Sequence, residues 1–410
     1  MHAYAPHVPR HVHTQRSHRA ARVAALVVVG VLALVAVGGA AVYLDLKQQI
    51  GVSDVAGLVQ GPTPSSEPDP DDPFTGRSLN ILVLGTDQRG GENTEIAGAG
   101  DGGMRSDTTM LVHISGDRSR IEVVSIPRDS LVEIPSCKLP DGTESGARYG
   151  MFNGAFTIGG GAQEDLTHAA ACTISTVQTL TDVPVTHHMV VQMDGVVDVV
   201  DALGGVRMCL PEPLVQDPAY GRFELPAGEQ TLDGREAIGY LRARHGEGLG
   251  LEQGSDLARI TRQQAFVDAL VRQVLDQNVL TSSPRLYRTI QAVLRAISAD
   301  PGLADPAALA GLAYSLRNLD PSEIVFTELP VVPAPTDANR VIWTEDADAI
   351  WERMAADEPP PSASPSPGGG RTGSDRPSAG AGGPAAGGTT PSSDPSASPS
   401  PSLLPGVCAD

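Results

Sequence analysis

The sequence lacks the short motifs by which many nucleotide-binding and hydrolytic enzymes are recognised. It has no Walker motif, and no glycine-rich fingerprint stands between a predicted strand and a predicted helix, so nucleotide binding is not favoured. A Gly-x-Ser-x-Gly elbow and a zinc-protease motif are also missing. Any chemistry must therefore come from residues that lie apart in the sequence and meet in the fold.

Positive charge is scarce as well. The chain has 29 lysine and arginine residues against 49 aspartate and glutamate residues, which gives a formal net charge of −20. This balance argues against a nucleic-acid-binding face over the whole molecule, so we expect no nucleic-acid partner. The arginines instead form local clusters in an acidic chain, which suits the capture of a defined anion.

Cysteine occurs only four times, at widely separated positions. No two of the cysteines have metal-ligand spacing, which argues against a metal site built on them. Four cysteines allow three pairings into two disulfides, and the sequence does not choose between them. Because Cys408 lies in a C-terminal tail, we expect a bridge between two of the other three, Cys137, Cys172 and Cys209.

One apolar run, Val23–Leu44, has about 22 residues and is long enough for a transmembrane helix. Four arginines and no acidic residue precede it, so the positive-inside rule places residues 1–22 in the cytoplasm and everything after Leu44 outside. The sequence thus predicts a single-pass protein of the cell membrane. A cleaved signal peptide is the alternative, and Gly38–Ala41 would be the place of the cut.

Composition divides the rest of the chain into three parts. Residues 45–77 are predicted to be an extracellular linker, and residues 358–410 a disordered tail rich in Pro, Ser, Gly and Ala. Between them, residues 78–357 are enough for one large α/β domain.

A predicted β-hairpin carries the first cluster of charges. Apolar, β-branched runs at residues 108–115 and 121–126 are joined by a short polar segment. A hairpin returns the chain to the edge it left, so the two pairs that flank it should meet there. These pairs are Arg105 with Asp107, and Arg128 with Asp129. An earlier strand, residues 79–84, would bring Asp87 and Arg89 to the same edge if it runs antiparallel to the hairpin.

A predicted helix from Asp256 to about Gln277 carries the second cluster. Asp256, Arg259 and Gln263 fall on the same stripe as its apolar residues, on the side that should be buried. Either they form an internal salt bridge that fixes helix packing, or the first two turns line a polar cleft. Arg262 falls off the stripe, so we expect it to face outward.

Just before this helix, Arg242 and Arg244 occupy alternate positions of an expected extended segment, where both would point to one side. Guanidinium groups match phosphate oxygens in pairs, and several in one cleft need an anion such as pyrophosphate to balance them. Carboxylates beside phosphate oxygens suit Mg²⁺. A carboxylate could also accept a proton from an attacking hydroxyl.

These residues belong to an ordered series of motifs that resembles the LytR–CpsA–Psr family. Each motif alone is weak, but their order and spacing between Leu79 and Val274 are specific. The motifs are Gly85–Arg89, Arg105–Thr108, Ile126–Asp129, Asn153–Phe156, Leu203–Val206, Leu232–Gly234, Arg242–Arg244 and Asp256–Gln264. The three cysteines of the domain and the composition look like the actinobacterial branch. Ala258 departs from the pattern, which usually has glycine there.

The resemblance implies an α/β/α sandwich with a central mixed β-sheet, preceded by one transmembrane helix. It implies a phosphotransferase that uses Mg²⁺ to move a glycopolymer from a polyprenyl-pyrophosphate carrier to peptidoglycan. The polymer could be arabinogalactan-like or teichoic-acid-like. Two alternatives stay open: a polyprenyl-pyrophosphate hydrolase, and a non-catalytic regulatory wall protein that binds the lipid pyrophosphate.

Carried over residue by residue, the resemblance also implies roles within the site. The catalytic residues would be Asp107, Arg128, Arg105 and Asp256. The pyrophosphate would be bound by Arg89, Arg128, Arg242, Arg244, Arg259 and Gln263. The metal ion would be held by Asp87 and Asp107.

Overall fold

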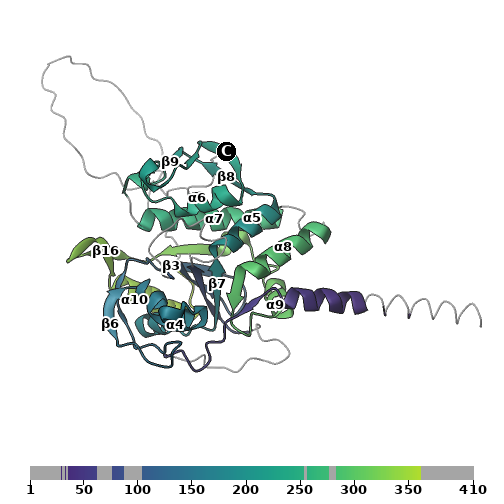
Figure 1. The fold of residues 1–410 in the computed structure, drawn as a ribbon, viewed down its shortest axis with the longest axis horizontal. Coiled ribbons are helices and arrows are strands. Elements are labelled where there is room, and N and C mark those ends of the chain that lie inside the picture. Colours follow the sequence, from purple (N-terminus) through teal and green to yellow (C-terminus); the bar gives the residue numbers. More distant parts are fainter. Residues whose placement is uncertain are drawn as a thin grey trace, which may run out of the picture.

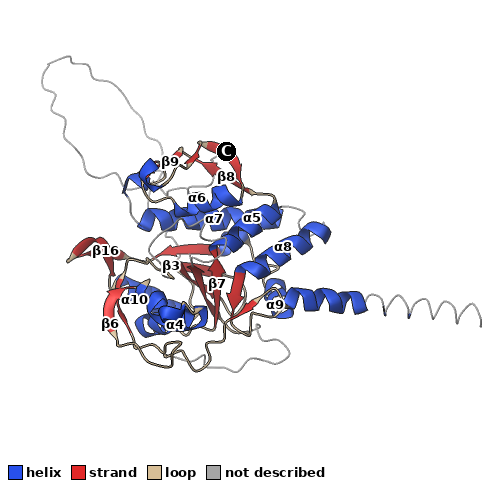
Figure 2. Cartoon of the chain, in the orientation of Figure 1, coloured by secondary structure: helices blue, strands red, loops and turns tan. Residues whose placement is uncertain are grey.

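A mixed seven-stranded sheet lies at the centre of the fold (Figure 1, Figure 2). This computed structural model describes residues 29, 33, 36–61, 76–86, 104–253, 256–276 and 283–361. β2 pairs antiparallel with β3 and parallel with β7, and β4 pairs parallel with β14, which confirms the predicted central mixed sheet. In order across the sheet, the strands are β1 (Gly51–Val52), β13 (Ile297–Ala299), β7 (His187–Gln192), β2 (Leu79–Thr86), β3 (Ser106–Ile114), β4 (Ile121–Ser125) and β14 (Ile324–Glu328).

Helices cover both faces of this sheet because its central strands are apolar on both sides. Alternate residues of a strand point to opposite faces. Leu82 and Leu84 of β2 accordingly belong to one core and Leu79 and Ile81 to another. The first core includes α3 (Gly154–Gly160), α4 (Leu166–Thr181) and α10 (Asp346–Ala355), and the second includes α8 (Ser283–Ala296) and α9 (Pro306–Ser315).

A second group of elements has its own core beside the sheet, and it lies above the sheet in Figure 1. Tyr240 and Phe266 are among the large side chains buried in it. Its helix α6 begins at a capping box, in which Asp233 and Glu236 each bond the other's backbone N–H. The elements are α5 (Met193–Leu203), β8 (Val206–Leu210), β9 (Leu214–Gln216), β10 (Glu224–Leu225), β11 (Gly228–Leu232), α6 (Gly234–Arg242), β12 (Gly246–Glu247) and α7 (Asp256–Asp276).

Two further strand pairs complete the fold: β5 (Leu131–Ile134) with β6 (Arg148–Met151), and β15 (Val331–Ala334) with β16 (Asp337–Trp343). A disulfide joins Cys137, in the loop after β5, to Cys172 of α4, with their Cα atoms 5.3 Å apart. This confirms the expectation that two of the three cysteines of the domain are bridged.

The N-terminal part of the chain enters the fold earlier than predicted. Residues 36–47 are helical, β1 pairs with β13, and Ile50 is buried in the second core. Part of the expected linker is therefore structured. Among the described residues, no helix is long and apolar enough to cross a membrane. Residues 1–28, 30–32, 34–35 and 362–410, which include much of the predicted anchor and nearly all of the predicted tail, lie outside the described residues.

A buried ion pair ties the sheet to the C-terminal helix. Glu122 of β4 is fully buried, and Arg353 of α10 donates to its two carboxylate oxygens at 2.5 and 2.8 Å. Thr327 of β14 donates to the same carboxylate at 2.6 Å. Burial alone would raise the pKa of Glu122, but the hydrogen bonds from Arg353 and Thr327 lower it below its usual value. The carboxylate therefore stays ionised and links three elements.

Replacing this carboxylate should weaken the fold in a pH-dependent way. We expect Glu122→Gln to lower the free energy of unfolding by about 3–5 kcal/mol at pH 7, because Arg353 loses its buried partner. The folded-state pKa lies below the ordinary value of 4.5. The contribution of Glu122 is therefore complete above about pH 4.5 and is lost as the pH falls through the folded-state pKa.

Urea unfolding at pH 7 and at pH values below 4.5 measures this change. The difference between the wild type and Glu122→Gln should shrink in acid. Asp268→Asn is the matched control, because its ion-pair partner Arg272 is 57% exposed, so breaking the pair should cost little. A Glu122→Gln effect that is equally large at both pH values would contradict this role.

Candidate active site

The candidate site forms where β2 ends and β3 begins. The two strands are antiparallel, which meets the condition stated for the sequence prediction. A β-bulge interrupts their pairing: Gly85 faces Thr108, and Thr86 faces Ser106. Asp107 is the extra residue of this bulge. Bulges re-aim side chains and leave a peptide group outside the ladder. Asp87 and Arg89, which follow β2 in sequence, lie outside the described residues.

Three arginines from separate segments converge on Asp107. Arg128, at the end of the hairpin, donates from Nη1 to Oδ1 of Asp107 at 2.7 Å. Arg244, after α6, donates from Nη2 to Oδ2 at 2.7 Å. Arg259 of α7 donates from Nη2 to the backbone carbonyl of Asp107 at 3.0 Å. The carboxylate and the carbonyl of one bulged residue thus organise three guanidinium groups.

The electrostatics of Asp107 follow from these contacts. Its side chain is 16% exposed, and burial alone would raise its pKa. The charges of Arg244, Arg128 and Arg259 outweigh burial, so the pKa of Asp107 lies below its ordinary range. Asp107 is therefore a carboxylate near neutral pH, and it is better suited to hold cations than to accept a proton.

Helix α7 turns its polar residues toward β3. Gln263 donates from Nε2 to Oγ1 of Thr108 at 2.8 Å, next to the contact of Arg259 with Asp107. Arg259 is 3% exposed and Gln263 is 8% exposed, so both are held by their neighbours in the fold. Asp256 is the first residue of α7, and its side chain lies outside what the structure describes.

The prediction that Arg262 faces outward is wrong. Its side chain is 2% exposed, and it donates to the carbonyl of Leu249 at 2.8 Å and to the carbonyl of Ala243. The stripe argument assumed that α7 has one buried side, but the segment that follows α6 packs against a second side. Arg262 holds the residue next to Arg244 and so positions that arginine.

The structure does not bring Arg105 into the group around Asp107. Its side chain is exposed, and no hydrogen bond or ion pair joins it to the described residues of the group. The simple alternation of a strand would place Arg105 and Asp107 on one side, but the bulge between them and β2 breaks that alternation. Arg242 is half-buried at the end of α6.

Sequence reasoning missed one arginine, Arg340 of β16. Its Nη1 lies 3.2 Å from Oδ1 of Asp129, and Nε of Arg128 lies 3.6 Å from Oδ2 of the same carboxylate. The β15–β16 hairpin is held there by Trp343, which donates to Oγ of Ser130 at 3.0 Å. No local signal could have found Arg340, because it lies 211 positions from Asp129.

Guanidinium and carboxylate groups therefore alternate along one chain of contacts. In order along this series of ion pairs, the residues are Arg340, Asp129, Arg128, Asp107 and Arg244. With Arg259 added, the described part of this group has four guanidinium groups and two carboxylates, and such an arrangement favours a phosphate or pyrophosphate anion. Among the described residues, no group of three or more His, Cys, Asp or Glu residues could hold a metal ion. A metal ion at Asp107 would share that carboxylate with Arg128 and Arg244.

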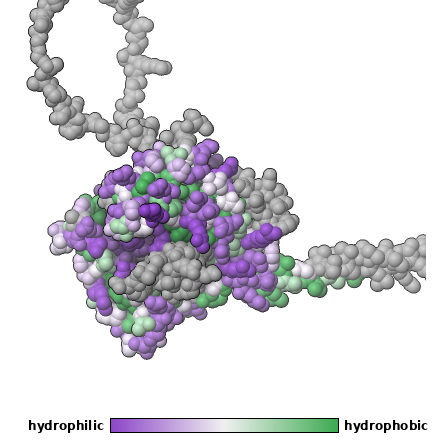
Figure 3. Space-filling view, turned by 45° about the horizontal axis from the view of Figure 1, so that its top comes forward, coloured by the Kyte–Doolittle hydropathy of each residue, from purple (hydrophilic) through white to green (hydrophobic). Residues whose placement is uncertain are grey.

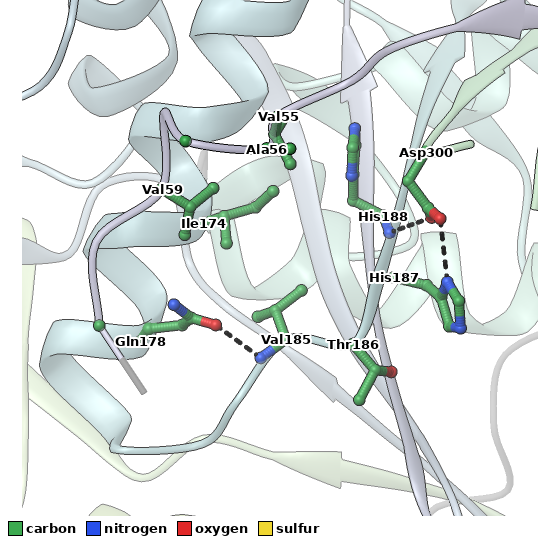
Figure 4. Close-up of a pocket in the computed structure, with 12 residues that line it drawn as sticks. Val55, Ala56, Val59, Ile174, Gln178, Val185, Thr186, His187, His188 and Asp300 are labelled. Atoms are coloured by element: carbon green, nitrogen blue, oxygen red, sulfur yellow. Dashed lines mark hydrogen bonds and ion pairs between the residues drawn. The ribbon is translucent and has the colours of Figure 1, made fainter. Parts of the chain in front are cut away.

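A separate pocket of 250 Å³ opens at the other end of the central strands (Figure 4). The pocket lies at His187, the first residue of β7, which pairs with Ile81 near the start of β2. Asp107 lies at the opposite end of β2, between the partners of Gly85 and Thr86. Figure 4 shows Asp300 bridging the His187 ring and the His188 backbone, beside apolar residues such as Val59. The hydrogen bonds of Asp300 are explained by packing at this end of the sheet.

Comparison with known proteins identifies a family. The LytR_cpsA_psr family model matches residues 60–356. The chain is 31% identical over 306 residues to the cell wall biosynthesis protein LcpA of Corynebacterium glutamicum. This alignment covers 69% of this chain and 57% of LcpA. It is 29% identical over 225 residues to the polyisoprenyl-teichoic acid–peptidoglycan teichoic acid transferase TagU of Halalkalibacterium halodurans, covering 55% of this chain and 60% of TagU. The chain thus spans less than two thirds of the length of these relatives.

A solved structure of TagT bound to LI-WTA has the same fold. It matches with a TM-score of 0.51 and 22% identity, over 75% of this chain and 98% of that one.

The arginines around Asp107 should give the protein measurable affinity for inorganic pyrophosphate. We expect Arg128→Ala to weaken this binding by about 10- to 100-fold, the equivalent of losing hydrogen bonds to a charged group. Isothermal titration calorimetry measures it. Arg272→Ala, which removes an exposed arginine of α7, is the matched control and should bind like the wild type. Equal affinities for all three proteins would show that pyrophosphate does not bind at Asp107.

The alternation of guanidinium and carboxylate groups also predicts that Arg340 acts on Arg128 through Asp129. We expect the effects of Arg340→Ala and Asp129→Asn on pyrophosphate affinity to be coupled by about 0.5–3 kcal/mol, because both break the same link. The double variant should then bind like Asp129→Asn alone. Strictly additive effects would show instead that Arg340 acts independently of Asp129.

Proposed function

Since the chain belongs to the LytR_cpsA_psr family, we propose that it is a phosphotransferase that moves a glycopolymer from a polyprenyl-pyrophosphate carrier to peptidoglycan. The observation that supports this most is the convergence of Arg128, Arg244 and Arg259 on Asp107. Such a group can bind the pyrophosphate and stabilise the charge that develops on it. The names of LcpA and TagU, a cell wall biosynthesis protein and a teichoic acid transferase, point the same way.

The proposed reaction joins an acceptor hydroxyl to the phosphorus atom that bears the glycan. The new bond forms between that phosphorus and the hydroxyl oxygen, and the bond to the bridging oxygen of the pyrophosphate breaks. Polyprenyl phosphate leaves, and the glycan phosphate stays on peptidoglycan. Guanidinium groups favour this displacement because they neutralise the charge on the leaving phosphate.

The residues around the phosphates would divide this work. Arg128 and Arg244, which Asp107 holds in place, would bind the phosphate oxygens. Because the low pKa of Asp107 makes it a poor base, we propose that the hydroxyl proton passes to another carboxylate predicted for the site, Asp256. Arg259 and Gln263 would fix α7 against β3, and Arg262 would hold the backbone beside Arg244.

We also propose that Mg²⁺ takes part, with Asp107 and Asp87 as its protein ligands. Mg²⁺ commonly binds through one or two carboxylates together with substrate phosphates, so Asp107 fits that role. When bound, the ion would neutralise charge on the leaving phosphate. The apolar run Val23–Leu44 supports the further proposal that the protein is anchored in the cell membrane with its catalytic domain outside.

A transfer assay tests the proposed function. The full chain, reconstituted in lipid nanodiscs, is given a polyprenyl-pyrophosphate glycan, Mg²⁺ and peptidoglycan fragments, and the products are followed by mass spectrometry. We expect a glycan-phosphate adduct on the acceptor. Arg128→Ala should lower its rate by about 100- to 1,000-fold, as expected for the loss of one charge-stabilising group. Arg272→Ala should be as active as the wild type.

The same assay separates the alternatives. Phosphate products that form without an acceptor, and no adduct, would identify a hydrolase. Binding of the lipid pyrophosphate without any turnover would identify a non-catalytic binding protein. An undiminished rate for Arg128→Ala would remove the group around Asp107 from the proposed mechanism.

A further inference from the structure

Helix α9 presents an uncharged face to its surroundings. No residue from Pro306 to Ser315 carries a charge, and within this helix only Leu312 is buried. Tyr314, near its C-terminal end, is 67% exposed. The other exposed residues are small: Ala307, Ala310, Gly311 and Ala313. The exposed face of α9 therefore carries no charge, in a chain whose formal net charge is −20.

Asp305, the residue that caps α9, is bonded to the N-terminal helix. It accepts a hydrogen bond from the backbone N–H of Ala307 at 2.7 Å, which begins α9. Its other carboxylate oxygen accepts from the hydroxyl of Tyr43 at 2.8 Å and lies 3.6 Å from Nζ of Lys47. Figure 1 shows α9 beside the base of this helix. The start of α9 therefore lies at the level of residues 43–47.

Further contacts join the N-terminal helix to α8 at the same junction. Asp45 accepts hydrogen bonds from Tyr287 at 2.6 Å and from Gln291 at 3.0 Å, both on α8. Leu46 packs against the core on that side of the sheet. The N-terminal helix is thus joined to α8 and α9 by several contacts, so its direction fixes the direction of the domain.

Tyr43 lies one residue inside the outer end of the predicted membrane span, Val23–Leu44. A carboxylate 2.8 Å from its hydroxyl lies at nearly the same depth, so Asp305 and the start of α9 would be at the lipid headgroups. The exposed side chains on the N-terminal helix, such as Val37 and Leu44, are apolar up to this level. In Figure 3 hydrophobic residues reach the surface where this helix leaves the domain.

The other end of α9 has the composition of a membrane interface. The guanidinium carbon of Arg317 lies 4.0 Å from the centre of the Tyr314 ring, a cation–π contact. Tyrosine and arginine both favour the boundary between lipid and water, where an apolar body and a polar end are solvated together.

We propose that the exposed face of α9 lies in the headgroup region of the outer membrane leaflet. This inference rests on the proposed membrane anchor. The anchor, α8 and α9 then hold the domain in one orientation at the lipid surface, rather than letting it swing on a linker. A lipid-linked substrate would meet the site around Asp107 from a fixed direction.

Fluorescence quenching by brominated lipids tests this placement. The full chain is reconstituted in vesicles of phosphatidylcholine and phosphatidylglycerol whose acyl chains carry bromine near the headgroup. Tyr314→Trp adds a probe on α9, and the signal of the two native tryptophans is subtracted with the wild type. Tyr149→Trp is the matched control, because Tyr149 of β6 is 59% exposed and Tyr314 is 67% exposed. Val37→Trp reports on the anchor itself.

We expect the bromolipids to quench the tryptophans at positions 314 and 37 and to leave the one at position 149 unchanged. Quenching at position 37 alone would overturn the placement of α9 and leave the anchor intact. A tryptophan at position 314 that is shielded from both the lipid and a water-soluble quencher would overturn it in favour of a second copy of the chain. No quenching at position 37 would refute the anchor, and with it this inference.

Discussion

The contact between Asp107 and three arginines is the interaction on which the candidate site depends. Arg128, Arg244 and Arg259 come from the hairpin end, the segment after α6, and α7. Without the bulged aspartate they would repel one another, and neither the second group of elements nor the sheet would hold them alone. The β-bulge makes the contact possible, because it turns the Asp107 side chain into the group and frees its carbonyl for Arg259.

The structure distributes support for this contact over distant parts of the chain. Gln263 holds α7 on β3, Arg262 holds the backbone beside Arg244, and Arg340 holds Asp129 next to Arg128. None of these three side chains needs to touch a substrate to matter. They limit the motion of Arg128 and Arg244, the arginines proposed to bind the substrate. Active sites built in this way keep their geometry when the substrate is absent.

The sequence predicted what local patterns can predict. Apolar, β-branched runs predicted β3 and β4, and this hairpin brings Arg128 to Asp107 at one edge, as expected. Helical periodicity placed Arg259 and Gln263 on the inner side of α7. The same periodicity failed for Arg262, because a helix packed on two sides has no single buried stripe. Arg340 could not be found, since its place depends on a hairpin more than 200 positions away from Asp129.

The buried guanidinium of Arg262 has a consequence for the thermodynamics of recognition. It donates to carbonyls on both sides of the segment that carries Arg244, so that segment is already ordered in the free protein. The conformational entropy of this segment is therefore lost when the chain folds, and not when an anion binds. Ordering of residues 243–249 is therefore not a slow step when an anion binds.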